Sequence, residues 1–189
     1  MANAERLPPI AADDLTPEQR QAAEEFKAGR GYGILGPFAV MVRSPEVMLR
    51  AKAMGDYLRF RNVLPKRVSE MVILLTARDW TQEFEWSHHF SYALEAGLSP
   101  ATIAAIAEGR RPAAMAEDEA AAWEFVSELS RKKAVSDPTY ARVLELWGER
   151  GVVDMVGIIG YYSLLAMMMN VARTKPDTSA GLPLARFPD

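Results

Sequence analysis

The stretch RVSEMVILLTARDWTQEFEWSHHFSYALEAGLSPATI, residues 67–103, joins two apolar segments through the short sequence DWTQ. In the first segment, apolar residues recur at the period of a helix, and its charged start favours a helix over the short strand that its β-branched residues also allow. After the second segment, Gly97 stands where glycine ends a helix in the left-handed conformation. The stretch therefore predicts two consecutive helices, over residues 65–80 and 83–96.

The second predicted helix carries both histidines of the chain, His88 and His89, and glutamates stand on the same turns. Residues three and four apart share one face of a helix, so Glu85 and His89 can touch and Tyr92 lies on the same side. A carboxylate one turn before an imidazole fixes the tautomer of the ring and raises its basicity, which suits general acid–base catalysis. The alternative is an ordinary surface pair, which stabilises a helix by only about 0.2–0.5 kcal/mol.

Glu70 lies in the preceding helix, and the apolar run MVILLTA follows it. On the surface of the helix this glutamate would be a solvated residue. In a buried position, loss of hydration would raise its pKa and let it hold a proton near neutral pH. Glu70, Glu85 and His89 are therefore the candidate catalytic residues, with Glu70 as a proton relay behind the other two.

A capping box begins the first helix of the chain. Thr16 is the predicted N-cap, Pro17 occupies the first helical position and Gln19 completes the box, so a helix should follow and stop near Gly29. The next segment, GRGYGILGPFAVMVR over residues 29–43, contains four glycines, which permit sharp turns. It predicts an irregular region that packs three apolar side chains inward: Phe38, Val40 and Met41.

Further helices are expected on both sides of residues 67–103. Ser44-Pro45 begins one that ends near Arg61, and its apolar residues recur at helical spacing: Val47, Met48, Ala51, Met54 and Leu58. The later helices should cover four ranges: 100–108, 117–133, 137–150 and 155–172. No strand-turn-strand pattern occurs, and the tail from Thr174 contains three prolines. The sequence therefore predicts an all-α, bundle-like domain with an N-terminal extension.

The composition excludes several classes of protein. The chain of 189 residues has a formal charge of −3 and a pI near 5.5, whereas a nucleic-acid-binding domain usually has a strongly basic face. It has no cysteine, which excludes disulfides and thiol chemistry. The N-terminal sequence lacks the apolar core of a secretory signal, so we expect a cytoplasmic location.

The sequence MVGIIGYYSLLAMMMNVA, residues 155–172, approaches the length of a membrane span. It contains polar positions at Tyr161, Tyr162, Ser163 and Asn170 and follows Asp154. A helix that is apolar on all sides is also typical of a bundle core or a subunit interface. We therefore expect a buried helix and no membrane, and we expect this helix, with its two tyrosines, to contribute to assembly.

Residues 67–103 resemble the signature of the carboxymuconolactone decarboxylase family: an acid in the first helix, then Glu-x-x-x-His, then AGLS. The later helices also look like the C-terminal half of that family. The resemblance implies an alkylhydroperoxidase D-like helical bundle over residues 61–175. Residues 1–60 would be an N-terminal arm and helical extension packed on the core, and residues 176–189 an irregular tail of the same structural domain.

The peroxidase branch of this fold places a Cys-x-x-Cys pair and a histidine on one helix, assisted by an upstream glutamate. By the spacing of the motif, Gln82 and Glu85 stand at the cysteine positions, His89 matches the histidine and Glu70 matches the glutamate. Without cysteines, dithiol peroxidase chemistry is not available. The decarboxylase branch also lacks the pair and keeps Glu-x-x-x-His, as this sequence does.

The resemblance implies a lyase: a cofactor-independent decarboxylase, or a related proton-transferring lyase or isomerase, acting on a small acidic lactone-like intermediate of aromatic degradation. His89 would donate the proton, oriented by Glu85 and reprotonated by Glu70. The alternative is a binding or scaffold protein, which predicts a pocket closed by side chains of residues 31–43 and no perturbed pKa at His89. A third reading is a nominal peroxidase activity, which the absence of cysteine disfavours.

Five further residues are candidates for contacts with the substrate: Trp86, His88, Arg78, Arg43 and Tyr92. The arginines would bind a carboxylate and Trp86 would exclude water, although packing and solvation are the ordinary roles of such residues. No cofactor and no metal is expected; a His/Glu metal site is the lesser alternative, because no second ligand pair of the usual spacing exists. The expected partner is a small acidic substrate, and the resemblance implies a homotrimer or homohexamer.

Overall fold

The structure, a computed structural model, describes residues 4–175 and 184, and every regular element within these residues is a helix. The elements are η1 (Ala12–Asp14), α1 (Pro17–Arg30), α2 (Pro37–Met41), α3 (Pro45–Phe60), α4 (Lys66–Asp79), α5 (Glu83–Glu95), α6 (Pro100–Ala107), α7 (Glu117–Lys132) and α8 (Asp137–Ala172). The predicted all-α fold is confirmed. Most of the expected tail lies outside the described residues.

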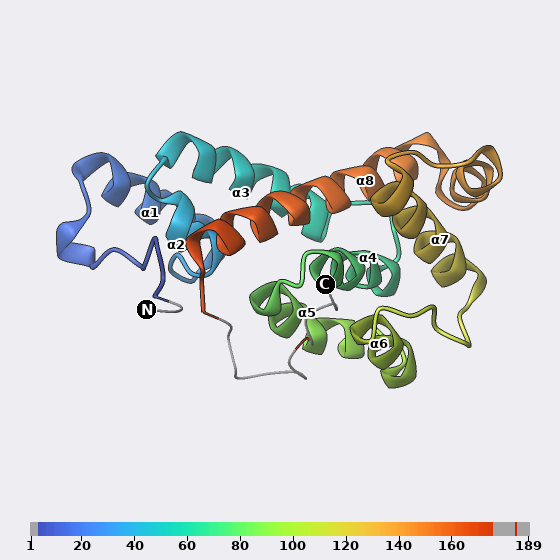
Figure 1. Cartoon of the computed structure of the whole chain (residues 1–189). Coiled ribbons are helices and arrows are strands. Elements are labelled where there is room, and N and C mark those ends of the chain that lie inside the picture. The colour runs from blue at the N-terminus through green and yellow to red at the C-terminus, as the bar shows by residue number, and fades with distance from the viewer. Residues whose placement is uncertain (1–3, 176–183, 185–189) are drawn as a thin grey trace.

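Helix α4 lies at the centre of the bundle and contacts α5, α6, α7 and α8. The long helix α8 crosses the whole molecule, with α3 running beside it and α1 and α2 at one end (Figure 1). One cluster of buried apolar side chains joins α1, α2, α3, α4, α7 and α8, and a second joins α4, α5 and α6. The N-terminal helices are therefore part of the main core.

The capping signals in the sequence are present in the structure. Thr16 Oγ1 accepts a hydrogen bond from the Gln19 amide at 3.2 Å, and the Gln19 side chain accepts one from the Thr16 amide at 3.1 Å. Helix α1 continues to Arg30, one residue past the predicted end, because Gly31 adopts the left-handed conformation that closes it, with φ of 76°. Gly97 plays the same role after α5, with φ of 90°.

Two N-terminal segments differ from the prediction. The segment expected to be irregular contains the short helix α2, which buries Phe38 as predicted. On α3, the predicted inward face is partly wrong, because Val47 and Met54 are 42% and 46% exposed. The helix instead turns Gly55 toward α8, where an added Cβ would lie 2.2 Å from the hydroxyl of Tyr161. This close approach brings the end of α3 over the middle of α8.

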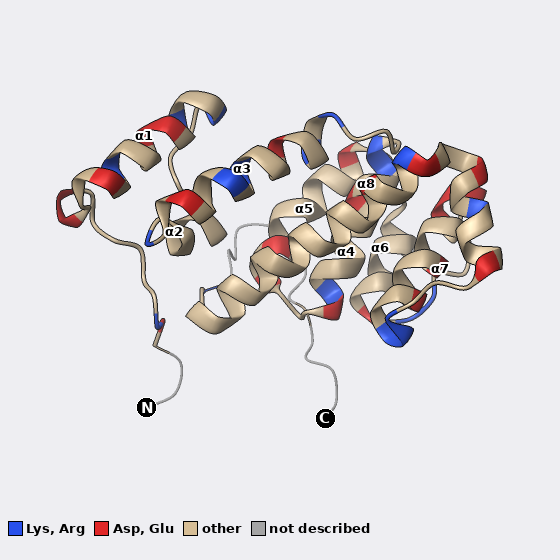
Figure 2. Ribbon diagram, turned by 90° about the horizontal axis from the view of Figure 1, so that it is seen from above, with Lys and Arg blue, Asp and Glu red and all other residues tan. Residues whose placement is uncertain are grey.

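The two predicted C-terminal helices are continuous in α8 except at Gly148, which has a φ of 67° and interrupts the helical geometry two residues before the predicted break. No charged residue lies in α8 beyond Asp154 (Figure 2). Its length and apolar composition alone would allow a membrane span, yet 44% of the most apolar window is buried inside the structure. Its polar positions contact the α4–α5 turn, since Ser163 accepts a hydrogen bond from Trp80 and Asn170 accepts one from Gln82. Helix α8 is thus the long helix of the bundle on which α2, α3, α4 and α7 pack.

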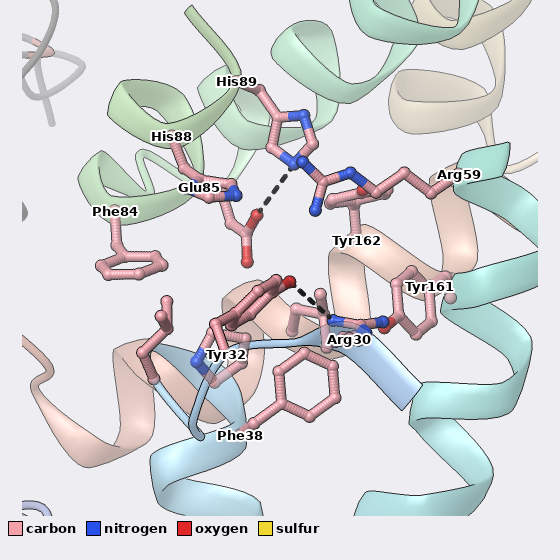
Figure 3. A pocket seen from close by; sticks show the side chains of 14 residues that line it. Arg30, Tyr32, Phe38, Arg59, Phe84, Glu85, His88, His89, Tyr161 and Tyr162 are labelled. Atoms are coloured by element: carbon pink, nitrogen blue, oxygen red, sulfur yellow. Dashed lines mark hydrogen bonds and ion pairs between the residues drawn. The ribbon is translucent and has the colours of Figure 1, made fainter. Parts of the chain in front are cut away.

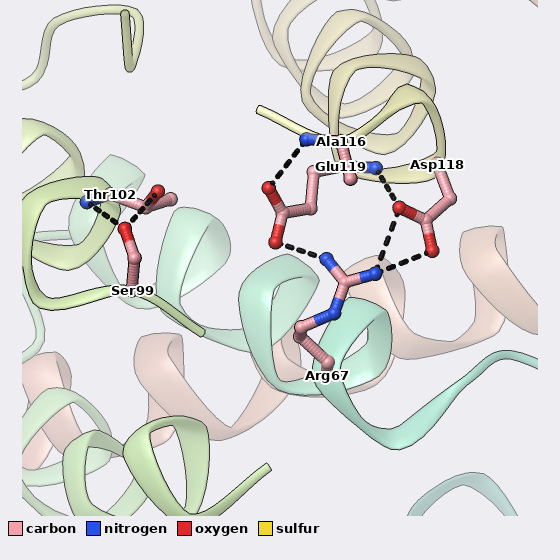
Figure 4. A network of polar contacts seen from close by, with 6 residues as sticks. All are labelled: Arg67, Ser99, Thr102, Ala116, Asp118 and Glu119. Atoms are coloured by element: carbon pink, nitrogen blue, oxygen red, sulfur yellow. Dashed lines mark hydrogen bonds and ion pairs between the residues drawn. The ribbon is translucent and has the colours of Figure 1, made fainter. Parts of the chain in front are cut away.

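A polar cluster fixes α4 against the start of α7 (Figure 4). The Arg67 guanidinium forms ion pairs with Asp118, at 2.8 Å, and with Glu119. Glu119 also accepts a hydrogen bond from the Ala116 amide at 3.0 Å, which caps the helix. These contacts hold α4 in place, and α4 is the helix that carries Glu70 into the core.

Candidate active site

Glu70, Glu85 and His89 meet in the interior between α4 and α5. His89 is 1% exposed, and its Nδ1 atom lies 2.7 Å from Oε2 of Glu70 on the neighbouring helix. Its Nε2 atom lies 3.7 Å from Oε2 of Glu85, one turn earlier on α5. The sequence therefore identified three side chains that the fold brings together, although they are 19 residues apart at the extremes.

The residue that orients His89 is Glu70 and not Glu85, which corrects the predicted arrangement. A separation of 3.7 Å between Nε2 and Glu85 is too long for a hydrogen bond, whereas 2.7 Å from Nδ1 to Glu70 is short. The packing of α4 on α5, which helical spacing alone cannot reveal, decides between the two acids. Because Nδ1 donates to the Glu70 carboxylate, the neutral ring leaves the Nε2 lone pair facing Glu85.

Glu70 is a buried carboxylate with a lowered pKa. Burial alone would raise that pKa. His89, through its hydrogen bond and its charge, and Lys66, through its charge, outweigh the effect of burial and lower the pKa to about 2. The Lys66 ammonium lies 2.5 Å from Oε1 of Glu70, and about half of the lysine side chain remains in contact with solvent. Glu70 is therefore ionised at neutral pH and is not a store of protons, contrary to the prediction for a buried position.

Glu85 has the opposite character. Burial, and to a lesser extent the charge of Glu70, raise its pKa to about 8, and Arg59 opposes the change. Burial also lowers the pKa of His89 below its ordinary value, against the effect of Glu70. Near pH 7 the cluster thus holds a protonated carboxyl group on Glu85 beside an unprotonated Nε2 on His89, so an acid and a base face each other in a dry environment.

A cavity of about 40 Å³ opens beside this pair. Fourteen residues line it (Figure 3): Arg30, Tyr32, Leu35, Pro37, Phe38, Gly55, Arg59, Phe84, Glu85, His88, His89, Tyr161, Tyr162 and Leu165. Since one water needs at least about 10–15 Å³, the cavity has room for a few waters and not for a ring compound. A ring can therefore enter only after part of the lining moves. Residues 30–38 form the outer wall, and Gly31 and Gly36, with their positive φ angles, flank its exposed part.

The other walls of the cavity come from α8 and α1. The ring of Tyr162 meets that of His89 edge-on, with the centroids 5.0 Å apart. Burial raises the pKa of Tyr161 and of Tyr162 far above that of an exposed tyrosine, so both hydroxyl groups stay protonated. These tyrosines were predicted to contribute to assembly, yet both are buried inside the monomer, because α8 turns this face toward the core. The Arg30 guanidinium forms an ion pair with Asp56 at 2.9 Å.

The structure separates the five predicted substrate-contact residues. His88 lines the cavity, and its ring lies parallel to that of Phe84 at 6.1 Å. Tyr92 is just outside the lining, in ring contact with His88 and His89. Trp86 does not line the cavity, since its indole packs into the second core cluster between α4 and α6.

The two arginines chosen from the sequence also lie elsewhere. Arg43 donates hydrogen bonds to the carbonyl oxygens of Ala39 and Pro8. Arg78 lines a separate groove of about 270 Å³ beside Trp123 on α7. The sequence instead missed Arg30 and Arg59, which do line the cavity. No sequence pattern marks Arg59: it stands one turn after Gly55, and the close approach of α3 to α8 at that position is a feature of the packing.

Within residues 4–175 and 184, no group of three or more His, Asp or Glu side chains is arranged to hold a metal ion. The polar groups that line the cavity include the acid–base pair, the two arginines and the tyrosine hydroxyl groups.

Three solved structures share this architecture. A protein described as an alkylhydroperoxidase AhpD core, an uncharacterized peroxidase-related protein from Ralstonia eutropha JMP134, matches with a TM-score of 0.72 and 16% identity, over 92% of this chain and 93% of that one. A single-substitution variant of the debrominase Bmp8, in complex with 2,3,4-tribromopyrrole, matches with a TM-score of 0.70 and 13% identity, over 91% of both chains. Apo Bmp8 matches with a TM-score of 0.69 and 13% identity, over 91% of this chain and 92% of its own. At these identities the likeness concerns the fold.

No curated protein matches the chain. The family model of the carboxymuconolactone decarboxylase family matches residues 45–128, from the start of α3 into α7, a range that contains Glu70, Glu85 and His89. This segment therefore matches the carboxymuconolactone decarboxylase family, and the chain has the all-helical fold of the AhpD core.

Proposed function

We propose that the chain is a cofactor-independent acid–base enzyme, a carboxymuconolactone decarboxylase-like lyase acting on a small, acidic, unsaturated ring compound. The observation that carries the proposal is the buried carboxyl group of Glu85, whose pKa burial raises, 3.7 Å from Nε2 of His89 at the wall of a cavity. Such a pair can give a proton to carbon and recover it without a metal or an organic cofactor.

In the proposed reaction, the bond between the ring carbon and the carboxylate breaks and CO2 leaves. The electron pair moves into the conjugated carbonyl system and returns to the ring carbon together with the proton of Glu85. Glu85 recovers its proton from water through Nε2 of His89, whose Nδ1 proton stays on the hydrogen bond to Glu70. Glu85 thus takes the role of proton donor that was expected of His89, His89 returns the proton, and Glu70 stabilises the transient imidazolium by its charge.

The aromatic walls favour this chemistry. Phe38, Phe84 and Tyr162 surround the pair with weakly polar surface. A localised carboxylate loses hydration there, while the transition state, in which the charge spreads over the ring, loses less. The two tyrosine hydroxyl groups stay protonated and can donate hydrogen bonds to a developing enolate oxygen.

A binding protein without catalytic activity is the second candidate. It is favoured by one observation: Tyr32, Leu35, Pro37 and Phe38 close the cavity, as that alternative predicts for residues 31–43. That alternative also predicts no perturbed pKa at His89, whereas burial lowers the pKa of this ring. The Bmp8 variant binds a brominated pyrrole, which shows that this fold accepts a small flat ring in another protein. Thiol-dependent chemistry is not open to this chain, which has no cysteine.

The test is turnover of carboxymuconolactone, the compound that names the family, followed as CO2 release by the full chain. Glu85→Gln keeps the size and neutrality of the acid but cannot transfer its proton, and His89→Gln removes the base. We expect each change to lower kcat/KM about 10²- to 10⁴-fold. Glu95→Gln, at the exposed end of the same helix, is the matched control and should leave the rate unchanged. Equal rates in all four proteins would remove the cluster from the mechanism.

A further inference from the structure

Arg59 is a cation of the cavity for which the described residues supply no ion-pair partner. It is half-buried on the last turn of α3, and Figure 3 shows its side chain reaching toward Glu85 and the ring of His89. Its guanidinium carbon lies 4.9 Å from the centroid of the Tyr92 ring and 5.5 Å from that of Phe60. Aromatic faces support a cation without neutralising it, so the charge of Arg59 remains available.

The other charged groups around the cavity are paired. Arg30 and Lys52 both contact the carboxylate of Asp56, at 2.9 and 2.8 Å. Lys66 contacts Glu70 at 2.5 Å. Glu85, the acid nearest to Arg59 in the lining, is protonated near pH 7, since burial raises its pKa to about 8. Arg59 is therefore the lining cation that has no carboxylate partner among the described residues.

We infer that Arg59 binds an acidic group of the substrate, and that this group is one that the reaction leaves in place. A guanidinium is suited to a carboxylate, which it can bind through two parallel hydrogen bonds. Bound to the carboxylate that departs as CO2, it would stabilise the ground state more than the charge-dispersed transition state and would slow the reaction. The substrate must then carry a second acidic group besides the departing one.

The aromatic lining defines the shape between the two ends of the substrate. Tyr92 lies against the guanidinium, and the rings of His89 and Tyr162 continue the surface toward α8. After the lining has opened, a flat ring placed along these faces would have its retained carboxylate at Arg59 and a ring carbon within reach of Glu85. This inference rests on the proposed function for the second acidic group, whereas the anion site at Arg59 stands on its own.

Equilibrium binding tests the anion site at Arg59 independently of the proposed function. The probe is furan-2-carboxylate, a flat monoanion, with furan-2-carboxamide as its neutral counterpart, titrated calorimetrically into the full chain at pH 7. We expect the wild type to prefer the carboxylate. Arg59→Gln should weaken carboxylate binding about 10- to 100-fold and leave the amide unaffected. Arg59→Lys should recover part of the loss, and Arg50→Gln, which alters an exposed arginine of the same helix, should change nothing.

Binding of both probes with equal affinity by the wild type, binding of neither, or unchanged carboxylate affinity in a folded Arg59→Gln protein would overturn the anion site. Glu85→Gln should still bind furan-2-carboxylate, because the anion site is at Arg59. A wild-type protein that binds this probe through Arg59 but does not turn over carboxymuconolactone would contradict the proposed function and leave the anion site standing. In turnover, Arg59→Gln should raise KM for a substrate with two acidic groups. A fall in kcat with KM unchanged would show that Arg59 acts on the transition state and not as the anchor.

Discussion

The raised pKa of Glu85 predicts that this residue destabilises the protein at neutral and alkaline pH. In the folded protein the pKa is about 8, against 4.5 for the ordinary group. Below pH 4.5 both the folded and the unfolded chain hold the proton, and the residue has no net effect. As the pH rises from 4.5 to 8, only the unfolded chain releases the proton, so the free energy of unfolding falls by about 1.36 kcal/mol per pH unit. The total loss is about 5 kcal/mol at pH 8 and above.

Glu85→Gln removes this dependence while keeping the size and the neutral state of the side chain. Relative to the wild type, we expect the variant to be nearly unchanged at pH 4, about 3 kcal/mol more stable at pH 7 and about 5 kcal/mol more stable at pH 9. Urea unfolding at the three pH values, followed by tryptophan fluorescence, measures the difference. Glu95→Gln, exposed on the same helix, should run parallel to the wild type. A constant difference between Glu85→Gln and the wild type across this range would refute the assignment of a protonated Glu85.

Three further predictions concern the imidazole ring of His89, the cavity wall at Gly36 and the exposed surface of α8. In an NMR titration, His89 should gain its proton only below pH 6.5, because burial lowers its pKa; an ordinary or raised value would contradict the neutral ring. Gly36→Ala should lower the free energy of unfolding by about 1–3 kcal/mol, since φ is 54° and the added Cβ would lie 2.3 Å from the Phe84 ring. An unchanged melting temperature would show that this wall adjusts to the added methyl group at no cost. Val153 and Val156 are 68% and 46% exposed on α8. The double variant Val153→Asp, Val156→Asp should therefore dissociate the expected trimer or hexamer, as measured by light scattering. A monomeric wild type would refute that assembly.

The local signals in the sequence predicted the helices well because each depends on neighbouring residues. The capping box at Thr16 and the glycine at position 97 define their helix ends through hydrogen bonds and backbone angles within one turn. The family motif likewise predicted that Glu70, Glu85 and His89 would be important together. Which acid would bond to the imidazole depended on how α4 lies on α5, and no pattern within either helix contains that information.

The arginines also show that sequence patterns do not reveal contacts that depend on helix packing. Arg43 and Arg78 were predicted to bind a substrate carboxylate, but the direction in which a long arginine side chain reaches depends on the helix packing. Arg59 reaches the cavity because Gly55 lets α3 approach Tyr161 closely, a contact between residues far apart in the chain. Helical periodicity identified the apolar face of α3 only in part, since glycine contributes to that face without counting as hydrophobic.

The wall of the cavity and its chemical groups come from separate parts of the chain. Residues 30–38 supply the wall from the N-terminal side of the family segment, and α4 and α5 supply the acids and the imidazole from within it. Under the proposed function, mutations in this wall would change which compounds are admitted while Glu70, Glu85 and His89 stay in place. A small library confined to those nine positions would then alter the choice of substrate without replacing a proton-transfer group.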